Sequence, residues 1–490
     1  MAVVTVPGAG TNTYQLQYNS PTSASIATQL LQTIYAANVS GALFPQVYSQ
    51  QGSTANVPSG KLGELIADGS TGNTNVVAPT GYLGLIDAST TAPVTIAGAA
   101  QANESVLGGA SDLTFYTNGG SGTVVGGDGN NVIASPTASG GAWTLNLYGV
   151  GNTSVYGGAA SDLIQSGNGH NLFFLGSGAD TVYSSGADTI IAGTGNTTVA
   201  TSAPGAFVYG GNGTDLLVNA GGADTFSAGG GAETIFAASS GGLYFLNTSP
   251  NLEFVATSAV ASTIVGGSGN ATLFGGSGTN LIFTGQENTV ADLQSSNNTI
   301  VGGSGNTTVY AGTGHDTLFQ GSGQLLYDAQ QSNSIIVSQS NSLGGTFFAY
   351  NGGQVALFGA NNGNVFVAAT GNATLQGSGA SGNNTYFAGT GADSMVAGSG
   401  NDTLVASTGA ATMVGGAGIE TFIFAKGSAG GTDLIQNFTA HDQLNFYGYG
   451  SNAVASQQVV NGSLVITLTD NTKITFLNGT TISAGQIHNL

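Results

Sequence analysis

Apolar residues return at a fixed interval of nine along most of this chain. Between about Val106 and Phe424 the sequence repeats a nonapeptide of the form G-G-x-G-x-D-x-U-x, in which U is apolar. GGSGNATLF and then GGSGTNLIF, starting at Gly266, form one clear stretch. A short fixed period is typical of stacked folds, in which each unit buries its apolar residue against its neighbours. The pattern therefore predicts an all-β chain folded as a parallel β-roll or β-solenoid.

The apolar eighth position of the repeat predicts the core. A three-residue strand whose middle side chain points inward would bury that position, and glycine-rich turns would link the strands. Two nonapeptides then make one coil, with a strand on each of two opposing faces. The residues expected to point inward are Ile164, Phe173, Val182, Val199, Leu217, Phe226, Ile235, Leu273, Ile282, Val309, Leu318, Leu404 and Phe422.

The two ends of the chain depart from this pattern. Asn19-Ser20-Pro21 is a helix-start signal, and apolar residues follow at helical spacing from Ile26 to Tyr35, which predicts a helix ending near Asn38. We interpret residues 1–105 as an N-terminal cap whose helix plugs the first open coil. Docking of that helix onto a neighbouring subunit is the alternative. Residues 106–424 would form the solenoid, and residues 425–490 a C-terminal β cap.

Charge narrows the classes of partner. The 490 residues carry a net charge of −20 with three cations, Lys61, Lys426 and Lys473. So few cations argue against binding nucleic acid or anionic membrane surfaces, whereas the acidity suits divalent cations or simply solubility. Cysteine is absent, so stacking or metal would have to hold a secreted fold together. No stretch is long and apolar enough for a membrane span, and the first residues do not form a signal peptide.

The nonapeptide resembles the repeats of the RTX (repeats-in-toxin) family, the calcium-binding β-rolls that bacteria secrete. The resemblance implies that an acid in the sixth position and backbone carbonyls of the glycine turns hold Ca²⁺ between stacked turns. Carboxylates and carbonyls supply the six to eight oxygens that Ca²⁺ prefers. Residues eighteen apart share one edge, as in Asp162 and Asp180. The implied ligands are Asp162, Asp180, Asp188, Asp215, Asp224, Glu233, Asp316, Asp393, Asp402 and Glu420.

Many repeats lack the family's acid. The sixth position holds Thr153, Asn171, Thr197, Ala271, Asn280, Thr307, Ala373 and Ala411 elsewhere. We therefore expect a few calcium ions in clusters, with Asn and Thr side chains forming hydrogen-bonded ladders between them. A metal-free ladder with solvated acids is the alternative.

Residues 419–446 resemble the segment that ends many RTX proteins. The matching positions are Asp433, Ile435, Phe438, Asp442, Leu444 and Phe446, whereas Asn437 and Asn445 replace family acids. The resemblance implies type I secretion through an uncleaved C-terminal signal, and hence an extracellular or cell-surface location. The alternation that follows predicts a hairpin around Asp470-Asn471.

The ninth position is expected to point outward, and it is often aromatic. Tyr183, Tyr209, Phe236, Phe245, Phe254, Phe274, Phe283, Tyr310, Phe319 and Phe387 occupy it, and Phe236 and Phe254 would share a face. Such patches with little charge usually mark interfaces, although stacking within the roll is the alternative. The leading hypothesis is a secreted structural protein that assembles with itself into a filament or surface layer. An adhesin or a module binding a surface, glycan or ice is the second.

An enzyme is the least favoured class. The sequence has no H-E-x-x-H, no G-x-S-x-G and no P-loop. The four histidines are scattered, and His170 and His315 fill the variable fifth position, where we expect them at the surface. We therefore predict no catalytic activity.

Overall fold

The computed structural model describes residues 1–50, 52–135, 140–238, 241–257, 259, 261–294, 296–339, 341–350, 352–359, 363–479 and 481–490. The chain divides into two compact units, Met1–Pro250 and Asn251–Leu490. Each unit is taken by itself below.

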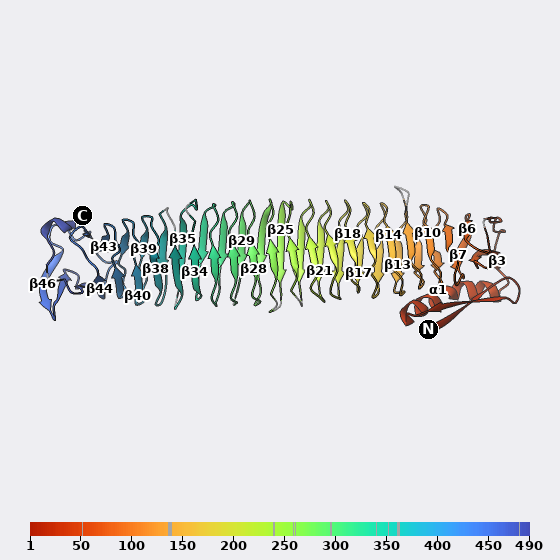
Figure 1. Ribbon diagram of the computed structural model, residues 1–490, viewed down its shortest axis with the longest axis horizontal. Helices are drawn as coiled ribbons and strands as arrows, with labels where there is room; N and C mark the ends of the chain where they lie inside the picture. Colours follow the sequence, from red (N-terminus) through yellow and green to blue (C-terminus); the bar gives the residue numbers. More distant parts are fainter. Residues whose placement is uncertain are drawn as a thin grey trace. The chain divides into compact units, whose positions relative to one another are not determined.

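Unit 1 is a parallel β-solenoid preceded by a hairpin and a helix (Figure 1). Each coil gives one strand to an odd-numbered sheet and the next to an even-numbered sheet, and strands of consecutive coils pair in parallel, as Ile164 does with Val182. The odd sheet of unit 1 contains β3 (Leu43–Tyr48), β5 (Leu62–Ala67), β7 (Tyr82–Asp87), β9 (Glu104–Leu107), β11 (Gly122–Val125), β13 (Trp143–Leu147), β15 (Leu163–Ser166), β17 (Thr181–Ser184), β19 (Thr198–Thr201), β21 (Asp215–Asn219) and β23 (Glu233–Ala237). The even sheet contains β4 (Gly52–Ser53), β6 (Thr74–Val77), β8 (Val94–Ala97), β10 (Leu113–Tyr116), β12 (Asn131–Ala134), β14 (Thr153–Tyr156), β16 (Leu172–Phe174), β18 (Thr189–Ile191), β20 (Phe207–Tyr209), β22 (Thr225–Ser227) and β24 (Leu243–Phe245).

Unit 2 repeats this architecture and ends in antiparallel strands. Its odd sheet contains β25 (Asn251–Ala256), β27 (Asn270–Phe274), β29 (Thr289–Asp292), β31 (Thr307–Tyr310), β33 (Leu325–Asp328), β35 (Gly345–Ala349), β37 (Val365–Ala368), β39 (Thr385–Phe387), β41 (Thr403–Val405), β43 (Thr421–Ala425), β45 (Gln443–Tyr447) and β49 (Ile487–Asn489), with η1 (Ala484–Gln486) just before β49. Its even sheet contains β26 (Thr263–Val265), β28 (Leu281–Phe283), β30 (Thr299–Val301), β32 (Thr317–Phe319), β34 (Asn333–Val337), β36 (Gln354–Phe358), β38 (Thr374–Gly379), β40 (Asp393–Val396), β42 (Ala411–Val414) and β44 (Thr432–Gln436), followed by β48 (Lys473–Phe476), β47 (Ser463–Leu468) and β46 (Val454–Val460).

The eighth position of the repeat forms the core, as predicted. All thirteen residues named for it are at most 1% exposed, because the middle residue of each short strand points between the two sheets. The hairpin predicted around Asp470-Asn471 is also present, as the antiparallel pair β47 and β48. The all-β solenoid prediction is therefore confirmed.

The predicted face of Phe236 and Phe254 is wrong. Phe254 is 0% exposed, because it pairs with the inward residue Leu273, and Val255 takes the outward place opposite Phe274. The repeat shifts by one position at this strand, and a shift of one residue moves a side chain to the other face of a sheet. The other nine aromatic residues predicted to point outward are exposed or half-buried.

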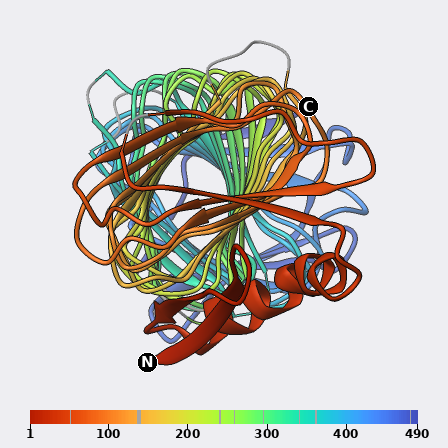
Figure 2. The same cartoon turned by 90° about the vertical axis from the view of Figure 1, so that its right-hand side faces the viewer.

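The helix forms where the sequence predicts it, but it does not plug the coil. α1 spans Pro21–Val39, and the Ser20 hydroxyl caps it by accepting the N–H of Ser23 at 3.2 Å. The helix and the antiparallel hairpin of β1 (Ala2–Pro7) and β2 (Thr13–Tyr18) lie against the outside of the coils of unit 1 (Figure 2). Among the described helices, none is long and apolar enough to cross a membrane.

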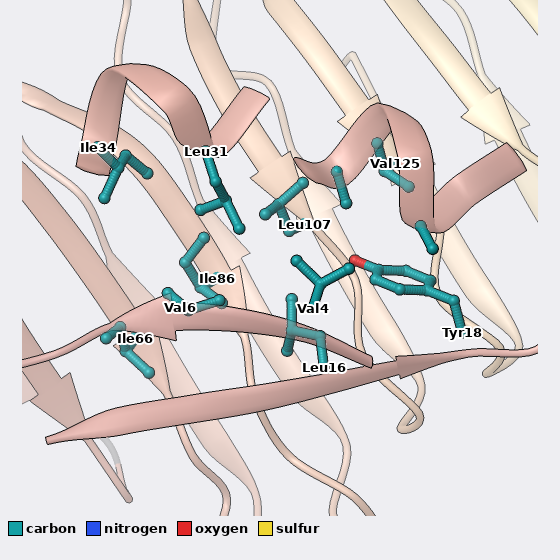
Figure 3. Packing of buried hydrophobic residues seen from close by; sticks show 12 residues of the cluster. Val4, Val6, Leu16, Tyr18, Leu31, Ile34, Ile66, Ile86, Leu107 and Val125 are labelled. Carbon is teal, nitrogen blue, oxygen red and sulfur yellow. The ribbon is translucent and has the colours of Figure 1, made fainter. Parts of the chain in front are cut away.

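An apolar cluster fixes this position of the helix. Leu31 and Ile34 of α1 and Val4, Val6 and Leu16 of the hairpin pack onto Ile66, Ile86, Leu107 and Val125 (Figure 3). Those four residues lie on the outer side of β5, β7, β9 and β11. The helix therefore covers the face of the odd sheet, and the parallel ladder already begins at β3, within residues 1–105.

One acid is buried beneath the helix. Glu64 is 0% exposed, and neither carboxyl oxygen has a hydrogen-bond partner within the described residues. Burial raises the pKa of Glu64 to about 8, so this side chain is neutral at neutral pH. A neutral carboxyl group is compatible with its place near Ile34 under the helix.

Turn glycines are required where consecutive coils meet. A Cβ added to Gly176 would lie 1.7 Å from the carbonyl oxygen of Gly158 in the preceding coil. Such a clash would force the two turns apart, because the strand pairing between the coils holds the backbone of both turns in place. The glycine positions of the repeat therefore set the closest approach of the coils.

We expect Gly176→Ala to lower the free energy of unfolding by roughly 1–3 kcal/mol, the usual cost of overpacking a tight site. Urea unfolding followed by circular dichroism would measure it. Gly485→Ala is the control, because nothing lies within 4 Å of the added Cβ. Equal stability of the two variants would contradict this account of the turns.

Candidate calcium-binding turns

The predicted acids lie inside the turns. All ten are at most 7% exposed, and most of them begin a strand or stand one residue before it. The part of the metal-free alternative in which these acids are solvated is therefore wrong. Their burial raises the question of what satisfies each carboxyl oxygen.

The first oxygen of each aspartate caps the backbone of the preceding coil. Oδ1 of Asp180 accepts the N–H of Asp162 at 2.8 Å, and Oδ1 of Asp162 accepts the N–H of Trp143 at 2.8 Å. The same bond, at 2.6–2.9 Å, is made by Asp188, Asp215, Asp224, Asp316, Asp393 and Asp402. A sixth-position aspartate therefore links one coil to the coil before it through a side-chain-to-backbone hydrogen bond, which we call a strap.

Asparagine makes the same strap without charge. Oδ1 of Asn171 accepts the N–H of Thr153 at 2.8 Å, and Asn280, Asn298 and Asn384 act likewise. Asn280, Asn298 and Asp316 also bond through their side chains, so the predicted asparagine ladder is present. Threonine does not extend it uniformly, because the buried hydroxyl of Thr197 has no partner within the described residues.

The two glutamates behave differently. Oε1 of Glu233 accepts the N–H of Gly229 in its own turn at 2.7 Å. Glu420 stands between Asp402 and Asp442 in register, and its N–H donates to Oδ1 of Asp442 at 2.9 Å. Neither carboxyl oxygen of Glu420 has a hydrogen-bond partner in the described part of the chain. The longer side chain thus leaves the strap position.

A second set of straps, in the fifth position, runs the opposite way. Oδ1 of Asn130 accepts the N–H of Asn152 in the following coil at 3.0 Å, and Oδ1 of Asn152 accepts that of His170 at 3.0 Å. Asn196, Asn297, Asn306, Asn372, Asn383 and Asn401 do the same at 2.7–3.0 Å. These residues were not predicted from the sequence, although asparagine recurs at this position. His170 and His315 are exposed, as predicted.

The C-terminal motif continues the sixth-position column. Oδ1 of Asp433 accepts the N–H of Ala411 at 2.8 Å, as Oδ1 of Asp442 does for Glu420. Both acids were predicted as parts of a secretion motif but were not named as candidate ligands. Their spacing of 22 from the capped residue, in place of 18, hid them from the nonapeptide pattern.

Burial raises the pKa of several of these carboxyl groups. Burial raises the pKa of Asp162 to about 6, although the hydrogen bond from the N–H of Trp143 acts to lower it. Burial raises the pKa of Asp433 to about 7. It raises the pKa of Glu420 to about 7, with further repulsion from Asp442. Burial likewise raises the pKa of Asp180, Glu233, Asp316, Asp393 and Asp402.

The remaining oxygens fit a calcium ion in part. Across the described ranges, no three Asp, Glu or His side chains converge into a metal site. Consecutive acids do adjoin in Asp162 with Asp180 and in Glu420 with Asp442, and a buried oxygen of Asp433 has no partner there. A cation at such a turn would take one or two carboxylates and complete its shell from stacked turn carbonyls. Its charge would also offset the desolvation that raises these pKa values and, at Glu420, the repulsion from Asp442.

The nonapeptides match a known repeat. The sequence model of the RTX calcium-binding nonapeptide repeat matches residues 103–134, 148–182, 184–199, 208–239, 261–290, 294–324 and 378–413. The chain is therefore an RTX-repeat protein. RTX nonapeptides bind calcium, so the match implies that this RTX-repeat protein binds Ca²⁺.

Other comparisons add little. No curated protein matches the RTX-repeat protein by sequence. A solved structure, the extracellular lipase LipA from Serratia marcescens, shares 15% identity over 46% of this chain with a TM-score of 0.19. The match spans 40% of the length of that lipase.

Two replacements of Asp162 distinguish its role as a hydrogen-bond acceptor from its proposed role in binding calcium. We expect Asp162→Asn to keep the strap to Trp143, so stability without calcium should be unchanged or higher at pH 8. Asp162→Ala should cost roughly 1–3 kcal/mol, because the buried N–H of Trp143 loses its acceptor. Both variants should show a smaller rise in Tm on adding Ca²⁺. Asn131→Ala is the control, since the buried Asn131 side chain makes an uncharged strap to the N–H of Leu113 and bonds to the carbonyl of Gly127, so this variant should keep the full calcium response.

Stability without calcium should fall as pH rises. The folded chain holds these protons to higher pH than the unfolded chain, so folding is favoured at low pH. That contribution is lost between about pH 4, where unfolded carboxyl groups titrate, and about pH 7. In chelator we expect Tm to drop by about 5 °C between pH 5 and pH 8, and added Ca²⁺ to restore it. Asp433→Asn should reduce the drop, and a Tm that rises with pH would contradict the raised pKa values.

Proposed function

We propose that this RTX-repeat protein is a secreted, calcium-binding structural protein that assembles with itself into an extracellular filament or surface layer. The observation that carries the proposal is an uncharged outer face on the even sheet of unit 2. From β26 to β36 the six strands contain no Asp, Glu, Lys or Arg, although the whole chain has a net charge of −20.

This even face presents two ordered columns. Strand register aligns Val265, Phe283, Val301, Phe319, Val337 and Phe358, so phenylalanine alternates with valine from coil to coil. Phe283, Phe319 and Phe358 are 37–42% exposed. The adjoining column is Thr263, Leu281, Thr299, Thr317, Ile335 and Ala356. A regular apolar face of this kind favours association of copies side by side.

The odd sheet of unit 2 differs. There Tyr310 lies in register between Asp292 and Asp328, and Glu253 is exposed. Charges on this face oppose close approach of a second acidic copy. The contrast between the two faces supports assembly through the even face.

An adhesin or surface-binding module is the second candidate. The alternation along the even face repeats every two coils, about 10 Å at the usual strand spacing, which suits a flat repetitive ligand such as a glycan. A binding module remains monomeric and acquires a ligand, whereas a structural protein forms polymers by itself.

Secretion is part of the proposal. RTX-repeat proteins are typically exported by type I systems, and Asp433 to Phe446 with the hairpin of β47 and β48 supply the segment that resembles their C-terminal signal. The proposal therefore places the protein outside the cell or on its surface. Loss of export after deletion of residues 430–490 would support this route.

Lysine on the even face should prevent assembly. We expect the wild-type protein in millimolar Ca²⁺ to form polymers visible by electron microscopy, and Phe283→Lys with Phe319→Lys to abolish them. Tyr310→Lys is the control for each single replacement, because it adds one lysine at similar exposure, between Asp292 and Asp328 on the odd sheet. A wild-type chain that stays monomeric at high concentration would refute self-assembly and favour the binding module.

A further inference from the structure

The first coil of unit 1 has a blunted edge. β3 pairs with β5, and no described strand pairs with its other side. The carbonyls of Ala42 and Tyr48 accept bonds from the β5 side, so even-numbered residues face β5 and odd-numbered residues face outward. Pro45 is outward-facing and has no N–H, which leaves this edge without a donor at its centre.

The last strand of the even sheet of unit 2 has an open edge. β46 pairs antiparallel with β47, and its other side has no partner strand in the described ranges. Every residue from Ala455 to Val460 is exposed, and Val459 is 54% exposed. The strand VASQQVV contains neither proline nor charge, two of the features that protect an edge, and a bulge interrupts its pairing with β47 between Val454 and Ser456.

The turn beside β46 determines which of its groups are free. Asn461 and Gly462 connect β46 to β47 with φ of 52° and 78°, as a two-residue type I′ turn requires. Val460 and Ser463 flank that turn and pair across it. Because backbone groups alternate along the strand, Gln457 and Val459 direct their N–H and C=O away from β47.

We infer that β46 pairs antiparallel with β46 of a second copy, about a two-fold axis through Gln457. The order of the strand is two apolar, three polar and two apolar residues, which is the same in both directions. This register places Gln457 opposite its own copy and Ser456 opposite Gln458, in the regular stretch that follows the bulge, and it brings Val459 and Val460 to the bulged end of the partner strand at Val454 and Ala455. Like side chains therefore meet, and the contact closes as a symmetric dimer.

Charge favours a second copy as the partner. Two chains of net charge −20 repel, and an uncharged strand is a place where they can approach closely. The inference shares with the proposed function the premise that copies associate, but it concerns a different surface. A dimer through β46 can form whether or not the even face drives polymers.

A charge swap at Gln457 tests the register. In Gln457→Lys two lysines would face each other across the axis, and in Gln457→Glu two glutamates would. We expect each variant alone to dimerise at least tenfold more weakly than the wild-type chain by analytical ultracentrifugation in Ca²⁺. An equimolar mixture should recover the dimer, because lysine then faces glutamate.

Gln443→Lys, at an exposed position of β45, is the matched control and should dimerise as the wild-type chain does. The chain has no cysteine, so Gln457→Cys should give a disulfide-linked dimer on oxidation and Gln443→Cys should not. A monomeric wild-type chain, or an undiminished dimer in Gln457→Lys, would overturn the inference. Polymers that persist in Gln457→Lys without a β46 dimer would overturn it while leaving self-assembly intact. Dimers without larger polymers would support it and refute the filament.

Discussion

The fold depends on a hydrogen bond from a side-chain oxygen of one coil to a backbone N–H of the coil before it. Parallel strands satisfy most of the backbone hydrogen bonds in a solenoid. The residue at the start of each strand still lies in a turn, so its N–H needs an acceptor from outside the strand pairing. Asp180 and Asn171 supply it for Asp162 and Thr153. The identity of the sixth residue therefore matters first for the turns, before any metal is considered.

This role changes how the acids bear on calcium. In Asp162 one oxygen is engaged with Trp143, and burial with the neighbouring Asp180 opposes the charge. Without a cation such a group keeps its proton to higher pH than a solvated carboxyl group does, and a bound cation would meet a carboxylate already fixed in place. A repeat with Asn in this position keeps the strap and gives up the charge. The mixture of Asp and Asn along the chain can thus adjust calcium dependence coil by coil without altering the turn.

The sequence allowed the solenoid, the inward residues and the N-cap of α1 to be predicted, because each follows from a local period or a short signal. Phe254 was misplaced because a one-residue shift of register is invisible to a pattern that tolerates slips. The helix was expected over the open coil, but its site depends on Ile66, Ile86, Leu107 and Val125, whose outward direction only the pairing register reveals. The acids were recognised by position, whereas their burial, and the part taken by Asn130 and its equivalents, required the coils to be stacked.

The straps also give the solenoid a direction. Each capped N–H in the sixth position donates to a side chain of the coil that follows it in sequence. A coil therefore has all its buried N–H groups bonded only when its C-terminal neighbour is folded. Among these straps, removing coils from the C-terminal side would deprive buried sixth-position N–H groups of their acceptors, whereas removing coils from the N-terminal side would deprive exposed fifth-position N–H groups, which water can reach. Asp433 and Asp442 make the last of these caps. Within each unit the buried sixth-position caps would therefore favour order that begins in the C-terminal coils and grows toward the N-terminus.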